Sequence, residues 1–151
     1  MNISIIEKDI NEINLIKPLW KGLNSVHLEK SINFKEKYMN FTFEKRMESI
    51  HAKAIKGIIK IDVVLDSDSD SYAGYCISSI EDGRGEIESI FIHKDYRKFG
   101  QGKKLMLRAL EWFNKNKVKD ISINVVYANE EALPFYESFG FSISNYILKR
   151  R

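Results

Sequence analysis

The first third of the chain changes from strand-like to helix-like spacing of its apolar residues. Residues 3–6 predict a first strand. Apolar residues at helical spacing then predict a helix that ends near Gly22 or Asn24; they are Ile13, Ile16, Leu19, Trp20 and Leu23. Pro18 lies within this pattern and predicts either a kink or two short helices. Residues 31–53 read as a loop followed by a further helix.

Two β-rich runs follow, at residues 55–65 and 72–80, and the acidic turn 66–71 between them predicts a hairpin. We expect that turn to be a solvated loop tip, although its charge could attract a cationic molecule. A second turn at residues 81–85 leads to the central stretch of the chain.

The central stretch, residues 86–113, combines a strand, a polar loop and a helix. Residues 86–93 are β-rich, and residues 94–102 form a loop that ends in Gly100-Gln101-Gly102. From Lys103 the apolar residues fall on one side of a helix at about 100° per residue. This stripe contains Leu105, Met106, Ala109, Leu110, Trp112 and Phe113.

The last third predicts a strand at residues 120–127, a short helix at 130–138 and a closing strand at 141–148. The predicted order is therefore β-α-α-β-β-β-α-β-α-β. This order is typical of an α/β (α+β) fold with a mixed, mostly antiparallel sheet flanked by helices.

The loop between the central strand and helix has the features of an anion site. The first amides of a helix lack intrahelical acceptors, and the helix dipole places positive charge there. Gly100 and Gly102 remove side chains that would keep a phosphate away and permit positive φ. Nearby cations add to the attraction; they are Arg97, Lys98, Lys103 and Lys104. The loop is therefore suited to a pyrophosphate.

Two common nucleotide motifs do not fit this loop. The P-loop needs an earlier glycine and a Ser or Thr after the lysine, and Gly102-Lys103-Lys104 has neither. The dinucleotide fingerprint needs a third glycine where Leu105 stands. Two glycines alone would equally suit a turn that merely joins a strand to a helix.

Arg97-Lys98-Phe99-Gly100-Gln101-Gly102 resembles the Arg/Gln-x-x-Gly-x-Gly/Ala signature of the GNAT superfamily of N-acetyltransferases, which bind the pyrophosphate of acetyl-coenzyme A (acetyl-CoA). The resemblance covers roughly residues 72–149. It includes Ile90-Phe91-Ile92 and Tyr96 upstream, and Asn129, Ala132, Pro134-Phe135-Tyr136 and Gly140-Phe141 downstream. Lys94 departs from the pattern, because many members have proline there.

The resemblance implies a set of cofactor-binding residues. The loop residues would hold the pyrophosphate: Arg97, Lys98, Phe99, Gly100, Gln101, Gly102 and Lys103. Main-chain groups of Ile90, Phe91 and Ile92 would pair with pantetheine, where the strand splays from its neighbour after Asn124-Val125. Asn129, Phe135 and Tyr136 would contact the same arm, although Asn129 could instead cap the helix that follows.

Acetyl transfer to an amine needs a base, because a lysine-like ammonium must lose its proton at a cost of roughly 4.6 kcal/mol at pH 7. Glu86 and Glu88 are two residues apart on the central strand, so their side chains would point to the same face of the sheet. Family members have a carboxylate at one or other position. We prefer Glu88, with Glu86 second, and either could instead be an ordinary ion-paired strand residue. Tyr136 matches the tyrosine that protonates the departing thiolate, although it could simply pack.

Composition agrees with a single domain over residues 1–151. The chain is 44% hydrophobic and 30% charged, which is typical of a globular protein. The net charge of +3 argues against a nucleic-acid partner. No apolar run is long enough for a membrane span, and neither a metal-ligand spacing nor a secretory signal is present. Cys76 is the only cysteine, so we expect a reducing, cytoplasmic setting.

The sequence therefore predicts an enzyme that moves an acetyl group from acetyl-CoA to a primary amine by direct attack in a ternary complex. The acceptor could be a small molecule or a protein or peptide amine. The alternative is a CoA-binding sensor of the same fold that has no working acid and base. An exposed edge strand from Phe141 onward would be compatible with a homodimer.

Overall fold

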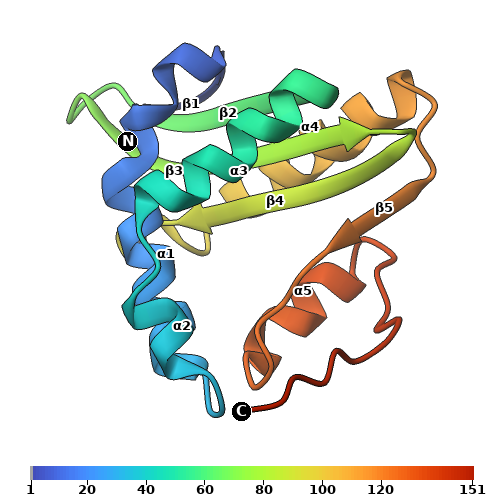
Figure 1. Cartoon of the computed structure of the whole chain (residues 1–151). Coiled ribbons are helices and arrows are strands. Elements are labelled where there is room, and N and C mark those ends of the chain that lie inside the picture. The colour runs from blue at the N-terminus through green and yellow to red at the C-terminus, as the bar shows by residue number, and fades with distance from the viewer. Residues whose placement is uncertain (1) are drawn as a thin grey trace.

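A computed structural model describes residues 2–151 of the chain (Figure 1). Its centre is a five-stranded sheet in the order β1-β2-β3-β4-β5. The strands are β1 (Ile3–Lys8), β2 (Ile58–Asp66), β3 (Ser71–Glu81), β4 (Arg84–Ile92) and β5 (Asp120–Ile123). Neighbouring strands are antiparallel except β4 and β5, which are parallel. The predicted fold class, a mixed and mostly antiparallel sheet with flanking helices, is confirmed.

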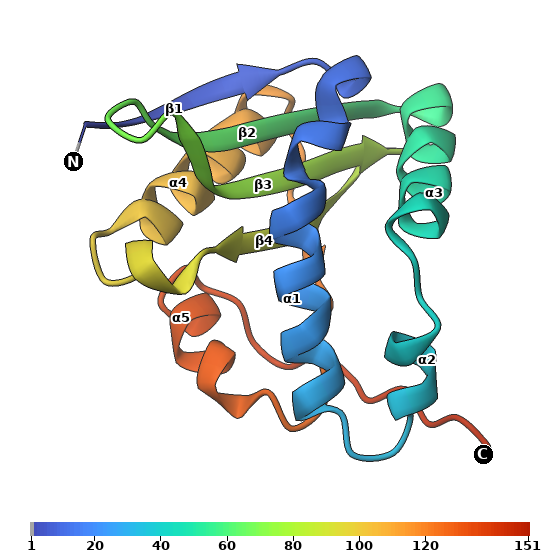
Figure 2. The ribbon, with the colours of Figure 1, turned by 90° about the vertical axis from the view of Figure 1, so that its left-hand side faces the viewer.

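Helices cover both faces of the sheet. The α-helices are α1 (Lys17–Lys30), α2 (Lys35–Met39), α3 (Phe43–Lys56), α4 (Gln101–Lys115) and α5 (Leu133–Glu137). The 3-10 helices are η1 (Ile10–Ile16), η2 (Lys94–Tyr96) and η3 (Glu130–Ala132). Figure 1 shows α3 crossing in front of the sheet and α4 behind it, and Figure 2 shows α1 running across the front. Within residues 2–151, no helix combines the length and apolar character needed to cross a membrane.

Each face of the sheet has its own apolar core. On the α1 and α3 side, Trp20, Met47 and Ile50 pack with Tyr75 and Ile77 of β3. On the α4 side, Leu105, Met106, Ala109 and Phe113 of the predicted stripe pack with sheet residues that include Ile87 and Cys76. Burial follows the alternation of strand side chains, so the sheet holds the two cores apart.

The helix predicted to end near Gly22 or Asn24 extends to Lys30. Gly22 lies inside α1 and does not end it. A Cβ at Gly22 would lie 3.1 Å from the ring of Phe91, so this glycine makes room for that ring. Pro18 lies in the first turn of α1, where its missing N–H costs nothing. Of the two alternatives, a kink or two short helices, the structure has two helices, η1 and α1, but α1 is 14 residues long and not short.

The predicted closing strand at residues 141–148 is wrong. The chain turns at Gly140, with φ of +90°, and residues 141–151 have no regular secondary structure. The large apolar side chains of this C-terminal segment are exposed; they are Ile143, Tyr146, Ile147 and Leu148. Residues with strand propensity form a strand only where the edge of a neighbouring strand can pair with them. β5 ends at Ile123, four residues before the predicted end of that strand. The edge strand that would have suited a homodimer is absent from the described chain.

Candidate active site

A gap opens between β4 and β5 halfway along β4. Their parallel pairing ends at Ile87 and Ile123, so the rest of β4 has no strand on that side. His93 donates its N–H to the Ala73 carbonyl on the β3 side, at 2.8 Å. Because main-chain groups alternate along a strand, those of Ile90 and Ile92 face the gap. The main chain of Phe91 faces β3 instead. The splay begins after Ile123, two residues before the predicted place after Asn124-Val125.

A β-bulge lies where the gap begins. Ile77 pairs with Ser89, but the next residue, Ser78, pairs with Ile87, so Glu88 is an extra residue in β4. A bulge turns two successive side chains to one face. Ser89 reaches the buried hydroxyl of Tyr75 at 2.7 Å, and Glu88 reaches side chains of α3 on the same face.

The Glu88 side chain is buried and surrounded by cations and hydrogen-bond donors. Its side chain is only 1% exposed. Arg46 Nη2 donates to the Glu88 carbonyl at 2.7 Å and to Oε1 at 3.1 Å, Ser79 Oγ donates to Oε2 at 2.5 Å, and Lys53 forms an ion pair with Oε2. Burial alone would raise the pKa of Glu88, but the bonds from Lys53 and Ser79 and the charge of Arg46 outweigh it and lower the pKa. Glu88 is therefore a fixed anion.

Glu86 has a more open environment. Its side chain is 28% exposed, and its Oε1 accepts a hydrogen bond from Lys53 Nζ at 3.2 Å. It lines a cavity of about 650 Å³ at the start of β4, together with Lys53, Ser79 and Ser122. Lys53 therefore bridges the two predicted carboxylates, which confirms that they share a face. Burial tends to lower the pKa of Lys53, but Glu88 and Glu86 outweigh it and raise the pKa.

The head of α4 is open, as the glycines predict. The first main-chain bond into the helix runs from the Lys104 N–H to the Gly100 carbonyl, so residues 101–103 have amides without helical acceptors. Gly100 has φ of +78°, which favours glycine. Gly102 lies within the helix, and a Cβ added there would lie 3.4 Å from the ring of Phe135, in ordinary van der Waals contact. These features fit a diphosphate.

Cations surround this head. Arg97 donates from Nε to the Ile92 carbonyl at 2.9 Å and lies over the Phe91 ring. Among residues 2–151, no carboxylate forms an ion pair with Arg97, Lys98 or Lys103. No carboxylate neutralises these three charges, so they are available to bind an anion.

Tyr136 and Phe135 of α5 pack beside α4. Burial raises the pKa of Tyr136 to about 12, so its hydroxyl is protonated at neutral pH. Within residues 2–151, no hydrogen bond to that hydroxyl contributes to the raised pKa, and Tyr136 forms none with other side chains. Asn129 precedes η3, and its side chain makes no capping bond, contrary to the alternative of a cap. Both groups are available to a ligand.

Sequence reasoning missed Arg46, Lys53 and Ser79, the partners of Glu88. Arg46 and Lys53 lie seven residues apart and so share one face of α3. That spacing was visible in the sequence, but nothing in it indicated that this face of α3 meets β4.

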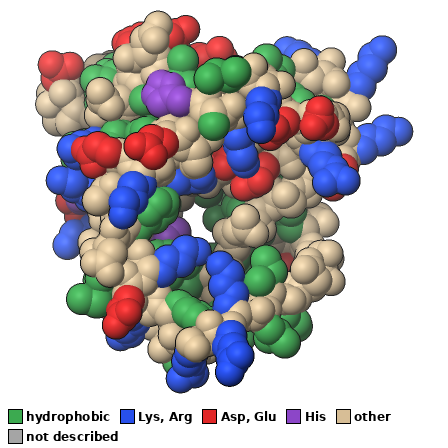
Figure 3. All heavy atoms as spheres, viewed as in Figure 1, with side chains coloured by type: hydrophobic (Ala, Val, Ile, Leu, Met, Phe, Trp, Pro, Cys, Tyr) green, Lys and Arg blue, Asp and Glu red, His purple; other side chains and the backbone are tan. Residues whose placement is uncertain are grey.

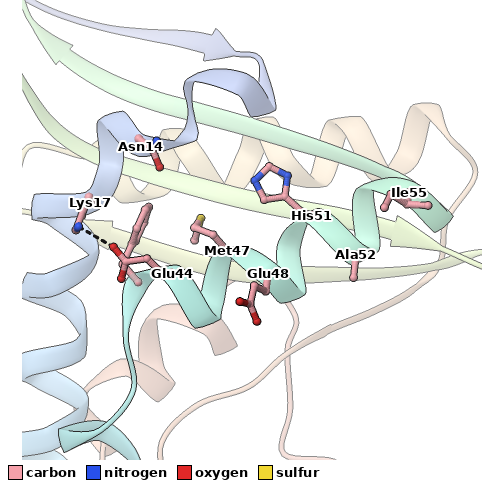
Figure 4. Close-up of a pocket in the computed structure, with 9 residues that line it drawn as sticks. Asn14, Lys17, Glu44, Met47, Glu48, His51, Ala52 and Ile55 are labelled. Atoms are coloured by element: carbon pink, nitrogen blue, oxygen red, sulfur yellow. Dashed lines mark hydrogen bonds and ion pairs between the residues drawn. The ribbon is translucent and has the colours of Figure 1, made fainter.

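A separate cavity of about 820 Å³ lies along α3 and η1 (Figure 4). Its lining includes Asn14, Lys17, Glu44, Met47 and His51, and none of the predicted site residues. We therefore place the candidate site at β4 and the head of α4.

Known structures share this fold over nearly the whole chain. A Pyrococcus furiosus protein proposed to be an acetyl transferase has a TM-score of 0.75 and 24% identity, with 99% of each chain covered. A GCN5-related N-acetyltransferase from Ralstonia eutropha has a TM-score of 0.77 and 14% identity, also with 99% of each chain covered. The PaiA N-acetyltransferase of Thermoplasma acidophilum, in complex with coenzyme A, has a TM-score of 0.72 and 16% identity over 97% of this chain and 94% of its own.

A family model for the acetyltransferase (GNAT) family matches residues 27–141. The chain therefore belongs to the GNAT family, and the family resemblance of the β4–α4 stretch is confirmed. The matched region contains the gap beside β4, the carboxylate pair and the head of α4.

Proposed function

We propose that the whole chain is one acetyl-CoA-dependent N-acetyltransferase that passes the acetyl group directly to a primary amine in a cytoplasmic ternary complex. One observation carries the proposal: an unpaired stretch of β4 leads from a carboxylate pair to the open head of α4. A thioester bound along that stretch would have a phosphate site at one end and proton-accepting groups at the other.

The head of α4 binds the cofactor's diphosphate. Amides of residues 101–103 and the cations Arg97, Lys98 and Lys103 supply this site, with Phe99 and Gly100 shaping the loop. The main-chain groups of Ile90 and the N–H of Ile92 orient the pantetheine arm, with Asn129 and Phe135 on its other side; the Ile92 carbonyl accepts from Arg97. Acetyl-CoA supplies the activated acetyl group.

The carboxylate pair removes the proton of the acceptor ammonium. Glu88 and Glu86 both remain candidates for the base, and we propose Glu86 first. The oxygens of Glu88 are occupied, and a lowered pKa makes a weaker base. The exposure of Glu86 supports it as the group that takes the proton, while Glu88 anchors Lys53 and attracts the acceptor's ammonium. Tyr136 donates a proton to the leaving thiolate, which its raised pKa supports.

The bridging of both carboxylates by Lys53 gives support to a second candidate, a CoA-binding sensor. If the ion pairs never open, then the protein binds CoA without a working base. Catalysis requires the acceptor's ammonium to displace Lys53 from Glu86.

Mass spectrometry of an amine and peptide panel incubated with acetyl-CoA separates the two functions. We expect at least one acceptor to gain an acetyl group, and Glu86→Gln and Tyr136→Phe each to lower turnover by about 10²-fold with CoA affinity nearly unchanged. Ser138→Ala, a neighbouring exposed site, is the control. CoA binding without acetylation of any panel member would favour the sensor.

A further inference from the structure

One ammonium group already lies where the proposed chemistry places an acceptor. Lys53 Nζ donates to Glu86 Oε1 at 3.2 Å and forms an ion pair with Glu88 Oε2. A general base takes a proton only from a group within hydrogen-bond reach, so an acceptor's nitrogen must also lie beside these two carboxylates. Among residues 2–151, Lys53 is the one cation that forms an ion pair with Glu86. Its amine therefore occupies the acceptor's position.

Lys53 also lies where the gap beside β4 begins. The pairing of β4 with β5 ends at Ile87, and Glu88 is the next residue of β4. Figure 3 shows a hollow beneath β4, between the part that carries α1 and α2 and the part formed by α5 and the C-terminal segment. This hollow gives a ligand access to the side of β4 that has no strand partner. In the proposed binding mode the thioester lies at the Glu88 end of the gap, beside the Lys53 amine.

Lys53 and Tyr136 approach this part of the sheet from opposite faces. Lys53 belongs to α3, whose apolar residues pack into the core on one face. Tyr136 packs against the core on the α4 face. The attacking nitrogen and the proton donor for the sulfur are therefore on different sides of the gap, so neither obstructs the other.

We propose that Lys53 is a self-acetylation site, at which the protein transfers the acetyl group of its own bound acetyl-CoA to Lys53 Nζ. Glu86 takes one proton from the ammonium and passes it to solvent. The free amine forms a bond to the carbonyl carbon, the carbon–sulfur bond breaks, and Tyr136 protonates the thiolate. The nitrogen loses a second proton to solvent, from which Tyr136 regains its own, and the products are acetyllysine and coenzyme A. This proposal rests on the proposed acetyltransferase function and adds a modification site to it.

Two opposing effects set the rate of this modification. Burial tends to lower the pKa of Lys53, but the hydrogen bonds and charges of Glu88 and Glu86 raise it, so the free amine is scarce at neutral pH. Delivery within one molecule works in the other direction, because a well-oriented neighbouring group can reach an effective concentration of about 10⁵ M or more. We therefore expect Lys53, which is only 28% exposed, to be acetylated before more exposed lysines.

The test is peptide mapping by mass spectrometry after the full chain is incubated with acetyl-CoA and no added amine. We expect Lys53 to gain an acetyl group about tenfold or more faster than Lys17 or Lys56. Lys17 is the matched control for an ion-paired lysine, because it pairs with Glu44 at 2.8 Å and is 40% exposed. Lys56 is an exposed lysine on the same helix as Lys53. Spontaneous acetylation would favour these two over Lys53.

Three variants test the proposed step itself. Lys53→Arg retains a cation for both carboxylates but has no amine to acetylate, so it should lose the modification, while circular dichroism and CoA titration verify that it folds and binds. Glu86→Gln and Tyr136→Phe should each slow the acetylation of Lys53 by about 10²-fold. In the wild type, the fraction modified per minute should not change with protein concentration, because donor and acceptor belong to one molecule.

Acetylation of Lys53 that is no faster than that of Lys17 or Lys56 would overturn the proposal. A fraction modified per minute that rises with protein concentration would also overturn it, because one copy would then modify another. If an added amine is acetylated while Lys53 stays unmodified, then the self-acetylation site is refuted and the proposed function stands. If neither is acetylated, both are refuted.

Discussion

At the scale of single residues, the surroundings of Glu88 decide what its carboxylate can do. A carboxylate buried to this degree is stable only when cations and donors surround it, and Arg46, Lys53 and Ser79 provide both. The same contacts occupy the oxygens that a general base would need free. Glu88, which the sequence analysis preferred to Glu86 as the base, is therefore better suited to anchoring an ion-pair network.

Glu88→Gln should lower the free energy of unfolding by about 2–3 kcal/mol at pH 7, because Arg46 and Lys53 lose the charge that balances them. Both cations are partly exposed, at 19% and 28%, so solvent limits the loss. Urea denaturation measures it. Glu7→Gln, at a carboxylate that is 60% exposed, is the matched control and should change stability much less.

The same ion-pair network makes the stability of the fold depend on pH in the acidic range. The pKa of Glu88 is lower in the folded protein, so its stabilisation is complete above the unfolded value near 4.3 and disappears as the pH falls through the lowered folded pKa. Thermal unfolding of the wild type should therefore show a steeper fall in Tm below about pH 4 than that of Glu88→Gln. Parallel curves for the two proteins would show that Glu88 is not the titrating group.

At the scale of elements, the turn into α4 depends on two glycines for different reasons. Gly100 has left-handed φ, so Gly100→Ala should destabilise the fold by about 1 kcal/mol. Gly102 is helical and has room for a methyl group beside Phe135, so Gly102→Ala should be neutral or slightly stabilising. Urea denaturation of both variants checks the difference, and equal losses would contradict this account of the turn.

The same elements show what local sequence can and cannot predict. The helical stripe of α4 and the paired glycines before it have local causes, and both were predicted. The bulge at Glu88 depends on how β3 and β4 pair, and the cationic partners of Glu88 come from α3, 42 and 35 positions earlier in the chain. Neither the bulge nor these partners has a local signal.

At the scale of the whole molecule, the sheet joins the two halves of the site. The order of strands was predictable from the alternation of β-rich runs and turns, because consecutive strands tend to be neighbours. The structure of the C-terminal segment was not predictable, because residues 141–148 have strand-like composition but no neighbouring strand to pair with. The hydrogen bond from Arg151 to Asn33, 118 positions apart in the chain, likewise has no local signal in the sequence.

The proposed function depends most on CoA binding at the head of α4, and calorimetric titration with coenzyme A tests that binding directly. We predict that the wild type binds CoA and that Gly100→Val and Gly102→Val each weaken binding by about tenfold or more, since each disturbs several amide bonds to a charged ligand. Gly83→Ala, at a glycine with φ of +73° and open space around it, controls for backbone strain alone and should leave affinity unchanged. No CoA binding by folded wild-type protein, or undiminished binding by both valine variants, would contradict the account.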